Sequence, residues 1–171
     1  MATANNTATA APAAPVPRST PAALPTDPAA SQVDFAMLAG KWKVVGVAPG
    51  DGVQAMAKDD PAYMGRVIDM SADRLAWEGP AEGGAMVGDR CDGPVTQHLT
   101  GATAKTYDVQ FAAQLKALGV TPGDPHGIEC DSGNWGPEAA GGATLYAQGN
   151  DVLALSWYDG VVLKLARQSG R

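Results

Sequence analysis

The chain has 171 residues, with 18 acidic and 12 basic side chains and a formal net charge of −6 at pH 7. This length suits one domain, and the acidic balance without a cluster of Lys or Arg argues against a nucleic-acid partner. No apolar run is long enough to cross a bilayer as a helix. The 21 glycines and the sparse charge favour many short strands and turns over long surface helices.

Residues 1–32 differ in composition from the rest of the chain, because they are rich in Ala, Thr and Pro. Such a segment buries too little apolar surface to offset its ordering entropy, which predicts a disordered tether. It lacks the basic start and apolar core of a secretory signal. Spacers of this kind are typical beside envelope anchors. We therefore favour a spacer that follows a removed signal or a lipid anchor over a native disordered tail. Residues 33–171 are then the single folded domain.

The first half of this domain predicts strands joined by loops. After a helical turn at residues 33–39, alternating apolar and polar residues predict a strand over residues 41–48. Shorter strands are expected at residues 65–70 and 74–78. The connection between the first two strands, residues 49–64, is long, and long loops are usually functional or mobile. We interpret it as a lid. A weaker strand at 89–99, interrupted by Gly93 and Pro94, and a short strand at 105–109 follow.

One short helix is predicted around residues 109–118. Phe111, Leu115 and Leu118 recur at helical spacing, Asp108 is a candidate N-cap, and Gly119 stands where a C′ glycine would. We expect the helix to cover an open face or end of the sheet. Strands at residues 127–131 and 143–148 follow, separated by a flexible loop over residues 132–142.

The strongest local pattern lies near the C-terminus, where Asp159 and Gly160 separate the apolar runs 152–158 and 161–167. An Asp-Gly pair in this setting predicts a two-residue type I′ hairpin, because both turn residues need positive φ. In that register the face that carries Lys164 is the outer one. The inner face then takes Val161, Leu163 and Leu165. Three apolar side chains lie outside and need cover: Leu153, Leu155 and Trp157.

About eight strands at this spacing predict a mainly β fold, an antiparallel barrel or strongly curved sheet. Gly40-Lys41-Trp42 opens the first strand, and Arg167 ends the last one. This arrangement resembles the lipocalins and the wider calycin group, in which a Gly-x-Trp near the start of the barrel packs under an arginine from its end. The resemblance implies a lipocalin-like barrel in which Trp42 and Arg167 are structural. The helix that follows the final strand in that group is missing here, so the resemblance is one of architecture.

Cys91 and Cys130 are the only cysteines. They favour a disulfide, and with it a periplasmic or secreted protein. Closing a loop of about forty residues stabilises by about 4 kcal/mol on the chain-entropy model. Two alternatives stay open: a pair of buried thiols, and a tetrahedral zinc site formed with His98 and His126. The usual close Cys-x2–4-Cys pair of structural zinc sites is absent. We expect no cofactor.

The favoured function is a non-catalytic envelope or secreted barrel that binds a small apolar or amphipathic ligand. Thioethers and aromatic rings suit such ligands, and the candidate ligand-binding residues are Met56, Tyr63, Met64 and Trp77. The alternative is a periplasmic inhibitor or immunity protein that binds a basic wall-degrading enzyme through acidic loops. Its candidate contacts are Asp59, Asp60 and residues 124–131. A hydrolase or metal enzyme ranks last, since neither a nucleophile elbow nor a phosphate-binding loop is present.

Overall fold

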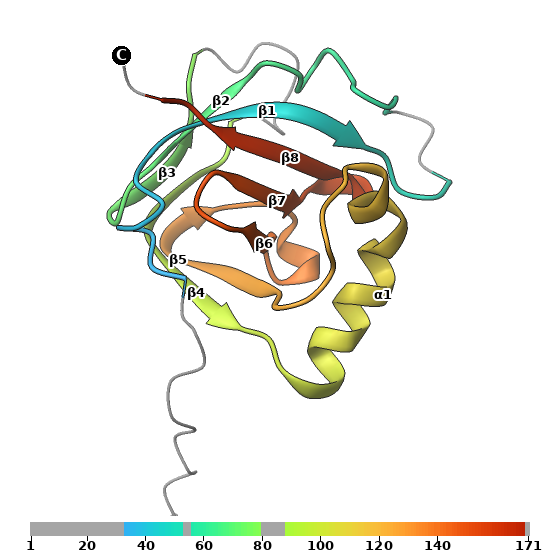
Figure 1. The fold of residues 1–171 in the computed structure, drawn as a ribbon. Helices are drawn as coiled ribbons and strands as arrows, with labels where there is room; N and C mark the ends of the chain where they lie inside the picture. The colour runs from blue at the N-terminus through green and yellow to red at the C-terminus, as the bar shows by residue number, and fades with distance from the viewer. Residues whose placement is uncertain (1–32, 53–55, 80–87, 170–171) are drawn as a thin grey trace, which may run out of the picture.

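A computed structural model of the chain describes residues 33–52, 56–79 and 88–169, and these form a closed antiparallel β-barrel (Figure 1). The predicted tether, residues 1–32, lies outside the described residues, as do residues 53–55 of the predicted lid. The strands pair in chain order, and the last returns to the first. Their bounds are β1 Gly40–Ala48, β2 Val67–Met70, β3 Arg74–Trp77, β4 Arg90–His98, β5 His126–Asn134, β6 Thr144–Gln148, β7 Val152–Ser156 and β8 Val162–Arg167.

The predicted fold class is therefore confirmed: the described part of the chain is mainly β, with eight strands and one α-helix. Two local predictions were wrong. The strand β4 runs through Gly93 and Pro94, because Gly93 adopts the positive φ of 60° that the local geometry requires. Likewise, residues 132–134 continue β5 and are not a loop.

The helix α1, Gly101–Ala117, begins earlier than predicted and includes the residues expected to form a strand at 105–109. Tyr107 packs one turn before Phe111, with ring centroids 6.3 Å apart, so the apolar stripe of the helix starts a turn sooner than predicted. The C-terminal prediction is confirmed. Gly119 has a φ of 65°, and the amide of Val120 donates to Leu115 O at 2.9 Å. Lys164 Nζ also donates to Leu118 O, and its positive charge stabilises the negative end of the helix dipole.

The C-terminal hairpin has a longer turn than predicted, and this changes its register by one residue. Asp159 and Gly160 do adopt positive φ, 57° and 71°, but within a short 3-10 turn, η3 Tyr158–Gly160. Leu155 pairs with Leu163, where the two-residue turn would have paired Ser156 with it. Because a one-residue slip exchanges the two faces of a strand, the prediction of which side chains in and just after β7 lie outside the barrel was wrong. Three of these side chains point into the barrel: Leu153, Leu155 and Trp157.

The outer face of β6, β7 and β8 is covered by α1, as Figure 1 shows beside the barrel. Phe111 and Leu115 from the helix pack with Tyr146, Ala154 and Val162 from the three strands. Near the helix C-terminus, Gly46 in β1 leaves room for Leu118, since a Cβ there would lie 2.9 Å from its Cδ2. The helix therefore buries a second apolar cluster outside the barrel.

One end of the barrel is closed by the predicted structural pair. The guanidinium carbon of Arg167 lies 4.5 Å from the centre of the Trp42 ring. The same guanidinium donates to the carbonyls of Ala39, Met37 and Asn150 at 2.8–2.9 Å. Trp42 Nε1 donates to Leu38 O at 2.8 Å, in the turn that precedes β1. The pair thus ties the start of β1 to the end of β8.

The two cysteines form the favoured disulfide, Cys91–Cys130, between β4 and β5. Their Cα atoms are 5.3 Å apart, within the range that a disulfide spans. No helix in the described ranges is long and apolar enough to cross a membrane.

Candidate functional site

The four predicted ligand-binding residues all belong to or border the main apolar cluster. Met56, Tyr63 and Trp77 are buried in it, and the half-buried Met64 packs against it. The rings of Tyr63 and Trp77 are tilted, with centroids 6.3 Å apart. The structure therefore brings Tyr63 and Trp77 together. Their role in binding stays a prediction, since burial of this kind also serves packing.

Tyr63 and Trp77 belong to a larger group of rings, which we call the aromatic cluster: Tyr63, Trp77, Trp135, Trp157 and Tyr158. Trp77 stacks on Trp135 at a centroid distance of 6.1 Å. The edge of Trp157 meets both of these indoles, at 5.5 and 5.2 Å, and meets Tyr158 at 5.5 Å. Such offset and edge-to-face pairs are favourable beyond their buried area.

The aromatic cluster lies at one end of the barrel because of strand direction. In an antiparallel barrel alternate strands run the same way, so β1, β3, β5 and β7 all end at the same side. Trp77 is the last residue of β3, Trp135 follows β5, and Trp157 follows β7. Tyr63 comes from the connection after β1. Along the ladder Trp77 pairs with Ile68, and Ile68 pairs with Trp42, so the aromatic cluster begins two strands away from the Trp42–Arg167 stack.

Two indole donors inside the aromatic cluster lack an acceptor. Trp77 Nε1 and Trp135 Nε1 are buried and have no hydrogen-bond partner among the described residues. A buried donor without a partner costs about 1–3 kcal/mol, and native structures contain few of them. The two N–H groups are therefore donors that could bind an acceptor from outside the described residues.

A carboxylate borders the aromatic cluster. Asp89 Oδ2 accepts hydrogen bonds from Tyr158 OH at 2.9 Å and from the Gly136 amide at 2.8 Å. Asn134 Nδ2 donates to Tyr158 OH at 2.8 Å and to the same carboxylate oxygen at 3.3 Å. Burial raises the pKa of Asp89 above its usual range. Burial, together with the neighbouring Asp89, also raises the pKa of Tyr158 to about 12. The network fixes the edge of the cluster.

The described part of the lid is held down by its own aspartates. Asp59 Oδ1 accepts from the Val47 amide at 3.2 Å, and Asp60 accepts from the amides of Ala62 and Ala57 at 2.8 and 3.1 Å. Those amides lower the pKa of Asp60. The two carboxylates predicted to contact a basic partner thus already accept hydrogen bonds from backbone amides of β1 and of the lid.

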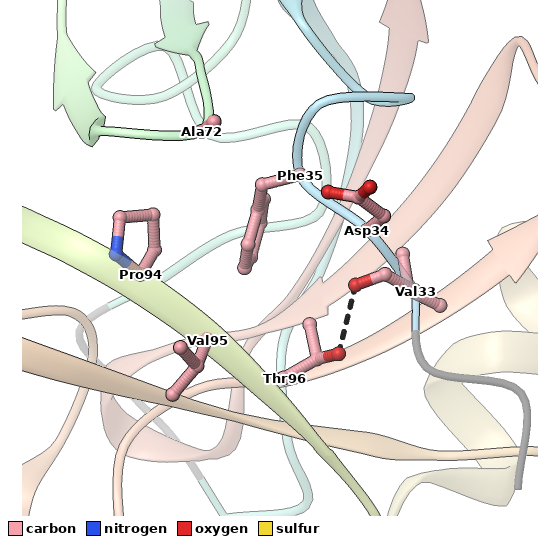
Figure 2. A pocket seen from close by; sticks show the side chains of 7 residues that line it. All are labelled: Val33, Asp34, Phe35, Ala72, Pro94, Val95 and Thr96. Carbon is pink, nitrogen blue, oxygen red and sulfur yellow. Dashed lines mark hydrogen bonds between the residues drawn. The ribbon is translucent and has the colours of Figure 1, made fainter. Parts of the chain in front are cut away.

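Three hollows are lined by described residues, and none of the predicted ligand-binding side chains lines them. Figure 2 shows one of about 400 Å³ beside β4, where Phe35 reaches toward Pro94 and Thr96 Oγ1 donates to Val33 O at 2.8 Å. A second, of about 360 Å³, lies beside β5 and is lined in part by Trp135, Asn134 and Glu138. A third, of about 150 Å³, separates β1 from α1. The second is the one that adjoins the aromatic cluster.

The two histidines proposed as zinc ligands do meet, but without the cysteines. His98 and His126 are cross-strand partners, and their ring centroids are 5.0 Å apart. Cys91 and Cys130 are committed to the disulfide, so the four-residue zinc set is not formed. Asp124 joins the histidines, with Oδ1 at 2.6 Å from His98 Nε2.

Sequence reasoning missed three members of this region: Asp89, Trp135 and Tyr158. Trp135 stands in the segment predicted as a flexible loop, although a large aromatic side chain there was a signal for burial. Asp89 carried no signal, because its partners come from positions 45 to 69 residues later in the chain.

Comparison with protein-family models, with curated proteins and with solved structures found no match for this chain.

Proposed function

We propose that this protein is a non-catalytic binding barrel that takes a small amphipathic ligand at the end where the aromatic cluster lies. The observation that carries the proposal is the pair of buried N–H donors on Trp77 and Trp135, which have no partner among the described residues. The two indole rings are stacked, with centroids 6.1 Å apart. An acceptor group on a ligand that reached both donors would remove the cost of two unsatisfied hydrogen bonds.

The surrounding side chains define the rest of the ligand. Aromatic faces contact an apolar body, and a few fixed polar groups orient it. Met56 and Met64 lie against the same interior, and thioether side chains adapt readily to a new shape. We therefore expect an aliphatic or aromatic body with one oxygen acceptor.

The same proposal includes a calycin-type relationship and a location outside the cytoplasm. The closed eight-stranded barrel and the Trp42–Arg167 stack support the relationship. The disulfide supports an oxidising compartment, such as the periplasm or the cell exterior. A lipid anchor or removed signal before residues 1–32 remains an expectation from composition.

The inhibitor of a basic wall-degrading enzyme stays a prediction. Its support is the net charge of −6. Asp59 and Asp60, its candidate contacts, bind backbone amides of the lid and of β1. Their replacement would disturb the lid as well as the surface charge, so it cannot test charge alone.

The test is a fluorescence titration of the full chain with 1-anilinonaphthalene-8-sulfonate, which combines an apolar ring system with an acceptor group. Trp77→Phe and Trp135→Phe keep an aromatic ring and remove the N–H. Each should weaken binding by about tenfold, the equivalent of one hydrogen bond of about 1.4 kcal/mol. Native mass spectrometry of freshly purified protein should also show a bound mass of lipid or metabolite size.

Trp42→Phe is the matched control, because it removes an indole N–H that already has an acceptor within the protein. It loses the hydrogen bond to Leu38 O, so it should lower stability without changing the affinity for the probe. Wild-type protein that binds no probe, or equal affinities in all four proteins, would contradict the proposal. So would a crystal structure with ordered water on both indoles and no ligand, because water would then satisfy the donors.

A further inference from the structure

Two histidines and an aspartate converge where β4 ends and β5 begins. His98 is the last residue of β4, His126 is the first of β5, and the two are paired across the ladder. Asp124 precedes His126 by two positions, and its Oδ1 lies 2.6 Å from His98 Nε2. One potential ligand atom from each of the three residues lies within 4.8 Å of the others.

Hydrogen bonds hold the His126 ring and the backbone beside the two histidines in place. His126 is almost fully buried, and its Nδ1 lies 2.9 Å from the Asp124 carbonyl oxygen. The amide of Leu99 donates to Pro125 O at 2.9 Å, which extends the ladder beyond the two histidines. A site built on paired strands needs little ordering when an ion binds, and this preorganisation favours affinity.

We propose that His98, Asp124 and His126 form a binding site for a divalent transition-metal ion such as Zn²⁺. Imidazole nitrogen is a preferred ligand of zinc, copper and nickel, and one carboxylate completes a three-ligand set that leaves a position for solvent. The Asp124 side chain is 63% exposed, so an ion can enter from that side.

The present contact between His98 and Asp124 must open slightly for an ion to fit. Neighbouring ligands on a tetrahedral ion with bonds of about 2.0–2.1 Å lie about 3.3 Å apart, compared with 2.6 Å between Nε2 and Oδ1 here. Asp124 is exposed enough to make this movement.

Coordination through Nε2 places the ring proton of neutral His98 on Nδ1. That atom is buried and has no hydrogen-bond partner among the described residues, with or without the proton. Moving the ring proton of His98 from Nε2 to Nδ1 therefore breaks no existing hydrogen bond at Nδ1.

The experiment is an isothermal titration of the metal-free, disulfide-bonded full chain with ZnCl₂. The wild-type protein should bind one Zn²⁺ per chain. His98→Gln and Asp124→Asn should each weaken binding by at least about tenfold, since ligand-set changes of this kind cost affinity on that scale. Asn suits position 124 because it tolerates the φ of 55° there. Glu129→Gln is the matched control: this exposed carboxylate lies on the same strand, and its replacement should leave zinc affinity unchanged.

A second readout keeps the test decisive if one variant folds poorly. Co²⁺ added to the wild-type chain should give visible absorption of a nitrogen- and oxygen-bound ion, and Asp124→Asn should reduce it. Zinc at a hundred times its dissociation constant should also raise the melting temperature, by mass action. The proposal is overturned if no one-to-one binding occurs at millimolar zinc. It is equally overturned if Asp124→Asn binds zinc as tightly as the wild-type chain.

Discussion

Removal of the Cys91–Cys130 disulfide should lower the free energy of unfolding by about 4 kcal/mol. The bridge joins residues 39 positions apart. On the chain-entropy model a loop of this length removes about 13 cal/mol/K from the unfolded ensemble, which is about 3.9 kcal/mol at 25 °C. The structure describes 126 residues, and a folded unit of that size has an unfolding entropy of about 0.26 kcal/mol/K. The expected fall in melting temperature is therefore about 15 °C.

The measurement is urea denaturation, followed by circular dichroism, of the wild-type chain and of the Cys91→Ala/Cys130→Ala double variant. Reduced wild-type protein is the second comparison, because it loses the bond and keeps the sulfur atoms. Cys91 is fully buried, so the double variant also loses some packing and should be the less stable of the two. A loss below about 1 kcal/mol on reduction would refute the reasoning, since it would mean that the loop is already restrained in the unfolded chain.

Three further predictions concern the barrel closure, the buried carboxylate and the helix. Arg167→Ala should cost about 2 kcal/mol in urea denaturation, because it removes a partly desolvated stack on Trp42 and its carbonyl contacts; an Arg167→Lys variant as stable as wild type would refute this. The raised pKa of Asp89 means that its stabilisation is complete below pH 3.8 and is lost as pH rises through the folded-state pKa. Asp89→Asn should lack that fall in stability, which a comparison of unfolding free energies across pH would show; parallel curves would count against it. Leu115→Ala should cost about 2–5 kcal/mol, because Leu115 is fully buried between α1 and the barrel. A cost under 1 kcal/mol in thermal or urea denaturation would indicate that α1 is loosely packed.

Local sequence pattern predicted only part of the aromatic cluster. Tyr63 and Trp77 were selected from the sequence because of their side-chain chemistry, and the structure places them in contact. Trp135 completes the group and supplies one of the two unpartnered donors, yet it lies 58 positions after Trp77 in the chain. Proximity across such a separation depends on the closure of the barrel, which no local pattern encodes.

The partners of the two histidines were also decided by strand pairing and not by sequence spacing. Sequence spacing alone joined them to the cysteines as a possible zinc set, because all four residue types bind zinc. The ladder between β4 and β5 instead pairs His98 with His126 and leaves the cysteines to bond with each other. Asp124, which lies between Gly123 and Pro125 in a turn and has a φ of 55°, contacts His98.

The sequence by itself predicted about eight strands and most of their positions, and it favoured the disulfide over two alternatives, because these depend on periodicity, on turn residues or on a choice among few partners. The Trp42–Arg167 pair was implied by the resemblance to the lipocalins. Only the tertiary structure decided the register of the last hairpin and the faces of its side chains. Asp159 and Gly160 have the conformations that their residue types favour, but burial of Leu153, Leu155 and Trp157 inside the barrel selects a longer turn. A one-residue slip leaves the local turn signal intact and exposes a whole apolar face, so the global core outweighs the local preference.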